Sequence, residues 1–270
     1  MQALLSFLQS FQWPRWVDVA VDEYPILVWL VCTVAVFVVN RLVIAPLDYI
    51  IFGKTYRKLN KIARFDWDIR VLSNTQAAYQ LICASILAYV HFDQFYNNTL
   101  FWSSTGGNLF LLVAQGYFFE DLIIMLAYRK TQLYSAPAVW HHIITLFTCL
   151  SSVILKRLST GIICVGFFEV STFLLNQIWF QETRKVTDWR ATLTGVLTFF
   201  ALTYRAIACG GLLWLVGRHF DDLVARYTLL EKFLSAMALG SFTLLNVAWF
   251  AMGVVKMIQT FMPKKAQKSA

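Results

Sequence analysis

The stretch AVWHHIITLFTCLSSVIL, residues 138 to 155, is apolar along most of its length and carries two adjacent histidines near its start. A helix needs about 20 apolar residues to cross a bilayer, so this run is close to the required length. Similar runs recur along the whole chain. The sequence therefore predicts an all-α polytopic membrane protein with seven transmembrane helices, at residues 24–44, 72–92, 105–127, 138–155, 158–180, 191–216 and 231–257.

The composition points to the same class. Hydrophobic residues make up 59% of the 270-residue chain and charged residues only 14%, whereas about a quarter of an average soluble domain is charged. The apolar runs are continuous rather than alternating, which argues against a membrane β-barrel. All five cysteines fall inside these runs without a CxxC pair, so we expect neither a disulfide nor a metal site.

The net charge of +8 comes from basic residues that lie mainly between the apolar runs. This placement indicates contact with membrane lipid headgroups rather than with nucleic acid. The positive-inside rule places the amino terminus in the lumen and the carboxyl tail in the cytosol. The first span is followed by the long basic loop 45–71, so we expect it to be peripheral to a core of six helices. The residues that set this orientation are Lys54, Arg57, Lys58, Lys61, Arg64, Arg70, Arg129, Lys130, Arg184, Lys185, Arg190, Lys264, Lys265 and Lys268.

Several polar side chains fall at membrane depth, where an ionisable group costs a few kcal/mol or more. With the predicted orientation they share a band from the bilayer midplane to the cytosolic leaflet, as a polar cavity open to the cytosol would require. Of the adjacent pair Glu120 and Asp121, we expect Asp121 to point inward. The members of the band are Glu120, Asp121, His141, His142, Glu169, Asn176, Gln177, Tyr204, Arg205 and Asn246.

The histidine pair has both a structural and a functional interpretation. A histidine near a helix end can extend to the headgroups, but adjacent residues on a helix point about 100° apart, so at least one of His141 and His142 should face the interior. Glu169 and Arg205 could likewise form a buried structural ion pair. A neutral imidazole is a base and a nucleophile near neutral pH, and a carboxylate such as Asp121 or Glu169 would orient it. Such a group could deprotonate an amine or hydroxyl while a thioester breaks, which suits cytosolic acyl-CoA as a co-substrate.

The segment HHIITLFTCLSSVILKRLSTGIICVGFFEVST, residues 141 to 172, resembles the signature region of the TLC domain, which ceramide synthases share. Against the ceramide synthase pattern HHxxTxxLxxxSxxxNxxRxGxLxxxxHDxxD, it departs at Thr148, Lys156 and Ser159. Phe168 and Glu169 replace the second HD, and Thr172 replaces the last Asp. The pattern is matched at His141, His142, Thr145, Ser152 and Gly161.

Two further segments, GYFFED at 116–121 and EVSTFLLNQIWF at 169–180, look closer to the TLC-domain-containing branch once called transmembrane protein 56-like. The resemblance implies a TLC domain at 65–262 with six core helices around a central cavity. It is preceded by residues 1–64, with an interfacial segment and the first span, and followed by the tail 263–270. It also implies an endoplasmic reticulum membrane and a catalytic role for His141 and His142, with Glu169 as the replacement carboxylate. With Asp121 from the polar band, these are the predicted catalytic residues. The cavity residues would be Glu120, Tyr117, Thr145, Ser171, Thr172, Asn176, Trp179, Tyr204, Arg205 and Asn246.

Two functions remain open on the sequence. The first is acyl transfer from acyl-CoA to a lipid acceptor, either ceramide synthase-like or lysophospholipid acyltransferase-like, without a permanently bound cofactor. The alternative is non-catalytic lipid binding, sensing or chaperoning that regulates membrane lipid composition, since the second HD is missing. A receptor or transporter fits the span count, but no paired broken helices of the transporter type are visible. The partners are membrane lipids and acyl-CoA, and a homo-oligomer stays open.

Overall fold

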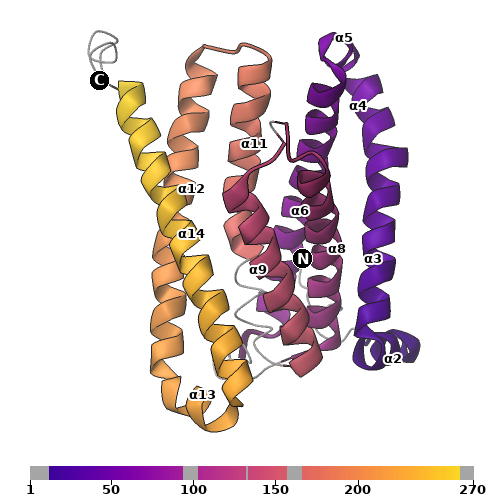
Figure 1. Cartoon of the computed structure of the whole chain (residues 1–270), viewed down its shortest axis with the longest axis vertical. Helices are drawn as coiled ribbons and strands as arrows, with labels where there is room; N and C mark the ends of the chain where they lie inside the picture. Colours follow the sequence, from indigo (N-terminus) through magenta and orange to yellow (C-terminus); the bar gives the residue numbers. More distant parts are fainter. Residues whose placement is uncertain (1–11, 94–102, 132, 157–165, 262–270) are drawn as a thin grey trace. The chain divides into compact units, whose positions relative to one another are not determined.

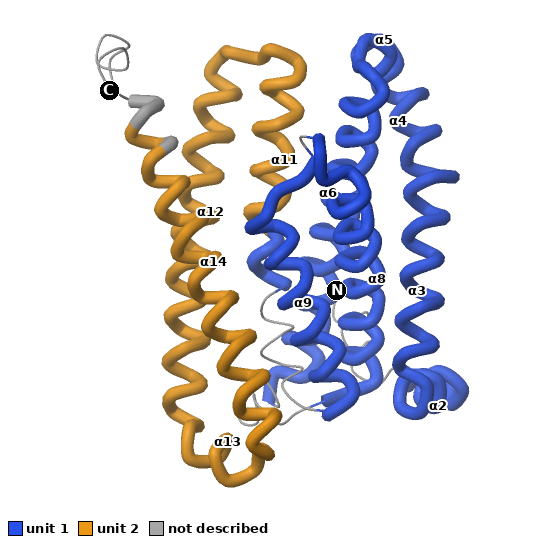
Figure 2. The backbone as a smooth tube through the Cα atoms, viewed as in Figure 1, with its two compact units in different colours: residues 1–169 blue, residues 170–270 orange. Residues whose placement is uncertain are grey.

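The computed structural model describes residues 12–93, 103–131, 133–156 and 166–261. Every element within these ranges is helical (Figure 1). The chain forms two compact units, residues 1–169 and residues 170–270 (Figure 2). The Lys-rich tail 263–270 and the first part of predicted span 158–180, including Gly161, lie outside the described residues.

Unit 1 contains both long helices and short helical segments. Its elements are α2 (Arg15–Glu23), α3 (Pro25–Val39), the π-helix η1 (Asn40–Ile44), α4 (Ala45–Ile51), α5 (Gly53–Lys58), α6 (Lys61–Val90), α8 (Thr105–Ala127), α9 (Ala136–Leu155) and the 3₁₀ turn η2 (Gly166–Glu169). Unit 2 packs α12 against both α11 and α14. Its elements are α11 (Val170–Thr183), α12 (Trp189–Arg218), α13 (Phe220–Arg226) and α14 (Leu229–Phe261).

Five helical segments of the described chain are long and apolar enough to cross a membrane, which confirms an all-α polytopic membrane protein. The predicted span 105–127 coincides with α8. The predicted span 72–92 starts later than α6, which continues back to Lys61. The predicted span 158–180 is interrupted, because η2 at Gly166 precedes α11. The five segments are Pro25–Ile51, Thr105–Ala127, Ala136–Leu155, Trp189–Arg218 and Leu229–Val255.

Helix ends follow local chemistry. The side chains of Asn60 and Ser104 accept hydrogen bonds from backbone N–H groups in the first turns of α6 and α8, and such caps satisfy donors that a helix leaves unpaired. Pro25 starts α3, where a proline costs no hydrogen bond. Lys156 ends α9 in the left-handed conformation with φ 54°.

The first span packs along one side against α8, although most of its surface is exposed. Within the described part of unit 1, α3 and α8 form the most extensive helix pair. They meet at Gly116, where an added Cβ would lie 2.9 Å from the backbone of Cys32 and Thr33. Small residues permit such close approach between membrane helices. This contact leaves Thr33 buried, while the other residues of α3 are exposed or half-buried. The peripheral position expected for this span relative to a six-helix core stays a prediction.

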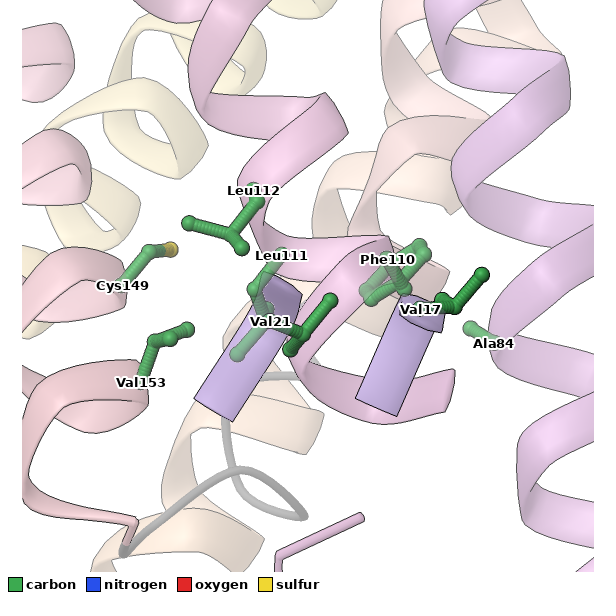
Figure 3. Packing of buried hydrophobic residues seen from close by; sticks show 8 residues of the cluster. All are labelled: Val17, Val21, Ala84, Phe110, Leu111, Leu112, Cys149 and Val153. Atoms are coloured by element: carbon green, nitrogen blue, oxygen red, sulfur yellow. The ribbon is translucent and has the colours of Figure 1, made fainter. Parts of the chain in front are cut away.

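One apolar cluster ties the helices of unit 1 together near α2. Val17 and Val21 of α2 are buried against Phe110, Leu111 and Leu112 of α8 (Figure 3). The cluster extends to α6 and α9 through Ala84, Cys149 and Val153. Trp16 on the other face of α2 is 73% exposed. One face of α2 therefore packs on the core while a tryptophan points outward, as in helices that lie at a membrane surface.

Candidate functional site

His142 links α9 to α8. Its Nδ1 lies 2.7 Å from the carbonyl oxygen of Ala138. Its Nε2 lies 2.9 Å from Asp121 Oδ2, which is close enough for an ion pair. The angle at this second contact does not meet the criterion for a hydrogen bond. Both ring nitrogens thus face oxygen acceptors. Only the doubly protonated imidazolium has an N–H toward each of them, so this geometry favours a cationic His142 beside the Asp121 carboxyl group.

His141 occupies a different environment on the same turn. Its ring is half-buried, and its Nδ1 lies 3.5 Å from the Thr145 hydroxyl oxygen, at the limit of a hydrogen bond. The two imidazole rings are nearly perpendicular, with centroids 5.5 Å apart. The ring of Phe118 contacts both of them edge to face. The pair therefore consists of one buried, charge-paired histidine and one more accessible histidine.

Tyr117 and Glu169 lie beside this pair. The Tyr117 side chain is buried, and the Ser73 hydroxyl of α6 lies near the Tyr117 hydroxyl. The Glu169 carboxyl, carried by η2, is within electrostatic range of both Tyr117 and His142. Three helices and η2 of unit 1 thus bring Asp121, Tyr117, the histidines and Glu169 together. Together with Ser73 and Thr145, these residues are called the histidine site below.

Asp66 and Arg70 form a neighbouring ion pair that the sequence did not reveal. Arg70 Nε donates to Asp66 Oδ1 at 2.9 Å across one turn of α6, and Asp66 lies within electrostatic range of Asp121. Burial raises the pKa of Asp66, and the Arg70 guanidinium opposes that rise. Both residues were assigned to the basic loop 45–71. Their i, i+4 spacing was the available signal for a helix surface pair.

Glu120 points to a different neighbour from Asp121. Its side chain is fully buried, and its Oε1 accepts a 2.6 Å hydrogen bond from Asn40 Nδ2 of η1. Its Oε2 has no hydrogen-bond partner. Both residues of the pair are therefore directed into the protein, Asp121 toward α9 and Glu120 toward the first span. The inward direction expected for Asp121 is thus shared by Glu120, for which it was not expected.

The family model of the TLC domain matches residues 66–255 of this chain. The chain belongs to the TLC-domain family. Neither the search of curated proteins nor the search of solved structures found a match. The TLC domain and the five apolar helices together make this chain an integral membrane protein in contact with membrane lipids.

The TLC domain extends into unit 2, which has a polar centre of its own. The buried Arg205 of α12 donates from Nε to Asn246 Oδ1 at 2.9 Å and from Nη1 to Ser171 Oγ at 2.7 Å. Its guanidinium carbon lies 4.9 Å from the centre of the Trp249 ring. Asn246 in turn donates to the Phe242 carbonyl. These contacts hold α11, α12 and α14 together at membrane depth.

The remaining predicted cavity residues of the TLC domain differ in exposure. Asn176 is buried, and Thr172 and Trp179 are half-buried. Tyr204 is 46% exposed, unlike its buried neighbour Arg205, because adjacent residues of α12 point in different directions. The cavity itself and the pairing of Glu169 with Arg205 stay predictions. Among the described residues, no group of three or more His, Cys, Asp or Glu side chains could hold a metal ion.

Proposed function

We propose that this TLC-domain protein acts in lipid metabolism and transfers an acyl group from acyl-CoA to a lipid acceptor at the histidine site. The observation that supports this proposal most strongly is the contrast between the two histidines. One is buried and charge-paired with Asp121 at 2.9 Å, and the other is half-buried beside it. A fixed positive charge next to an accessible base is the arrangement that acyl transfer requires.

His141 is the proposed proton carrier. It takes the proton from the amine or hydroxyl of the acceptor as that atom attacks the thioester carbonyl. A tetrahedral intermediate forms with negative charge on its oxygen, and the His142 imidazolium stabilises that charge. When the C–S bond breaks, His141 returns the proton to the leaving thiolate. The products are the acylated lipid and CoA with a free thiol, so the protein ends the cycle unchanged.

Asp121 and Glu169 are the proposed positioning residues. Asp121 keeps His142 protonated and fixes its ring against the Ala138 carbonyl. Glu169 adds a second negative charge near His142 and is the residue where the ceramide synthase pattern has Asp. Glu169 therefore keeps an acidic side chain where the pattern has Asp, although Phe168 replaces the second histidine.

A thiol-release assay on purified protein tests this function. The protein, reconstituted in lipid nanodiscs, receives oleoyl-CoA with either sphinganine or a lysophospholipid, and free CoA thiol is measured over time. His141→Ala should reduce release by roughly 100-fold or more, the usual contribution of a general base. His219→Ala, on the turn between α12 and α13 in unit 2, is the control and should match wild type. Undiminished release from folded His141→Ala protein would contradict the proposal.

Lipid binding without turnover is the second candidate function. The departure from the ceramide synthase pattern at Phe168 and Thr172 favours it. It predicts that purified protein retains lipid but releases no CoA thiol with any acceptor. For both functions we propose residence in the endoplasmic reticulum with a lumenal amino terminus and a cytosolic carboxyl tail, supported by the distribution of basic residues between the spans.

A further inference from the structure

Two glutamines of α6 have buried amide groups without a hydrogen-bond partner. The side chains of Gln76 and Gln80 are only 8% and 5% exposed, and neither Nε2 atom has a partner. A buried donor left unpaired costs free energy comparable to a lost hydrogen bond. These two donors lie one helical turn apart on one face of α6, so both could donate to a single ligand.

These glutamines lie on the face of α6 that meets the histidine site. Ser73, whose hydroxyl lies near that of Tyr117, is seven residues before Gln80 and therefore on the same side of the helix. At Gly166 of η2, an added Cβ would lie 3.4 Å from the Gln80 carbonyl oxygen. The η2 turn that covers Gln80 also carries Glu169. The amide pair thus lies on the same side of α6 as Ser73 and next to the turn that carries Glu169.

The depth of the pair along α6 indicates the kind of ligand. Seven residues of helix correspond to about 10 Å, so Gln80 lies about 10 Å from the level of Ser73 along the helix axis. The neighbours of the pair on this face, Leu72, Ala77 and Ala84, are buried and apolar. A ligand there must be largely apolar and yet offer oxygen acceptors to two N–H groups.

We infer that Gln76 and Gln80 bind the ester or amide carbonyl oxygens of a membrane lipid whose polar head lies at the histidine site. Carbonyl oxygens are acceptors without donors, and in a phospholipid they lie between the head and the acyl chains. The placement of the head rests on the proposed function. Recognition of the carbonyl by the two amides does not, since it needs no chemical step.

A comparison of ester and ether lipids tests this inference. The protein is reconstituted in an equimolar mixture of dioleoyl phosphatidylcholine and its dialkyl ether analogue, which lacks the carbonyl oxygens. Native mass spectrometry then measures the ratio of the two lipids retained. Wild type should retain the ester form in about tenfold excess, as two neutral hydrogen bonds would give. Retention at the ratio of the bulk mixture would overturn the inference.

Substitutions connect this preference to the two glutamines. Gln76→Leu/Gln80→Leu should lose the ester preference, and a variant that keeps it would also overturn the inference. Gln115→Leu is the matched control, because Gln115 is a fully buried glutamine of α8 with an unpartnered amide. The Phe110 ring of α8 stacks on Tyr79 of α6. Gln115 follows Phe110 by five residues, so its side chain points about 140° away from the face of α8 that contacts α6 there. This control should keep the wild-type preference.

The same experiment separates this inference from the proposed function. All lipid ratios are measured without acyl-CoA, and wild type is compared with His141→Ala. An ester preference in both, together with no CoA release by wild type, would sustain the amide site and refute acyl transfer. CoA release by wild type without any ester preference would refute the amide site and sustain acyl transfer.

Discussion

His142 Nε2 lies 2.9 Å from Asp121 Oδ2, so an ion pair connects α9 to α8 in unit 1. The other ring nitrogen faces the Ala138 carbonyl oxygen at 2.7 Å. Both ring nitrogens of His142 therefore face oxygen acceptors, an arrangement that favours its doubly protonated form. In Figure 1 the turn between α8 and α9, close to this pair, lies toward the same end of unit 1 as α5.

Asp121→Asn should abolish most acyl transfer. The amide preserves the size of the side chain but not its charge, so His142 loses the partner that favours the imidazolium. We expect CoA release to fall by roughly 100-fold, as general acid–base catalysis of this kind contributes. Asp221→Asn, on the exposed face of α13, removes one carboxylate outside the site and should leave the rate at the wild-type value. Equal rates for the two variants would refute the role of Asp121.

The hydrogen bond between Asn40 and Glu120 should be a strong determinant of stability. Asn40→Leu leaves a fully buried carboxyl without its donor, and such a loss costs about 1–3 kcal/mol or more. The double variant Asn40→Leu/Glu120→Leu removes both polar groups and should recover much of that loss. Thermal unfolding of wild type, both single variants and the double variant forms a double-mutant cycle. Additive losses would show that the two side chains do not interact.

Gly116→Ala should weaken the contact between α3 and α8. The added Cβ would lie 2.9 Å from backbone atoms of Cys32 and Thr33, which cannot move aside as a flexible side chain can. Forcing the helices apart costs about 1–3 kcal/mol, which should appear as a lower melting temperature in detergent. Gly240→Ala is the control, because nothing lies within 4 Å of its added Cβ. A melting temperature of Gly116→Ala at or above that of wild type would contradict the packing.

The pH dependence of stability should include a contribution from Asp68, which precedes the predicted span 72–92. Tyr56 donates to its two oxygens at 2.8 and 2.9 Å. Burial raises the pKa of Asp68, while the hydrogen bonds from Tyr56 and Asp48 and the charge of Arg41 oppose the rise. The folded state therefore binds the proton more tightly than the unfolded state, whose Asp pKa is about 3.9. This stability is fully present below about pH 4 and is lost as the pH rises through the folded pKa.

Asp68→Asn tests that contribution, since the amide oxygen still accepts from Tyr56 but cannot ionise. Melting temperatures are measured from about pH 4 to neutral pH in the same detergent. The wild-type value should fall more steeply with rising pH than that of the variant. Identical slopes would mean that Asp68 titrates alike in the folded and unfolded states.

Hydropathy was sufficient to predict the apolar helices but not how they pack. The span 105–127 coincides with α8 because its ends are marked by a capping Ser104 and by the change to polar residues after Ala127. The start of α6 was missed, since Lys61 to Arg70 is too charged to be read as a span. The close packing of α3 on α8 was not predicted, because hydropathy does not reveal which helix a small residue such as Gly116 contacts.

The residues of the histidine site could be predicted from the cost of burying polar groups, but the partner of each residue could not be predicted. Glu120 and Asp121 are adjacent and chemically alike, yet one meets Asn40 and the other His142. The π-helix at Asn40 that orients this contact has no sequence signal. Asp66 and Gln80 were not nominated because they lie in segments read as a loop and as an ordinary span. Their significance depends on the neighbours that folding supplies.

The central claim is that the histidine pair transfers an acyl group, and mass spectrometry of the purified protein tests it most directly. Wild type and His141→Ala/His142→Ala, each in mild detergent with oleoyl-CoA, are analysed intact and after lipid extraction. The account predicts that oleoyl-CoA is consumed and an acylated lipid appears only with wild type. A bound lipid that is present unmodified and in equal amount in both proteins would contradict the claim and make the histidines structural.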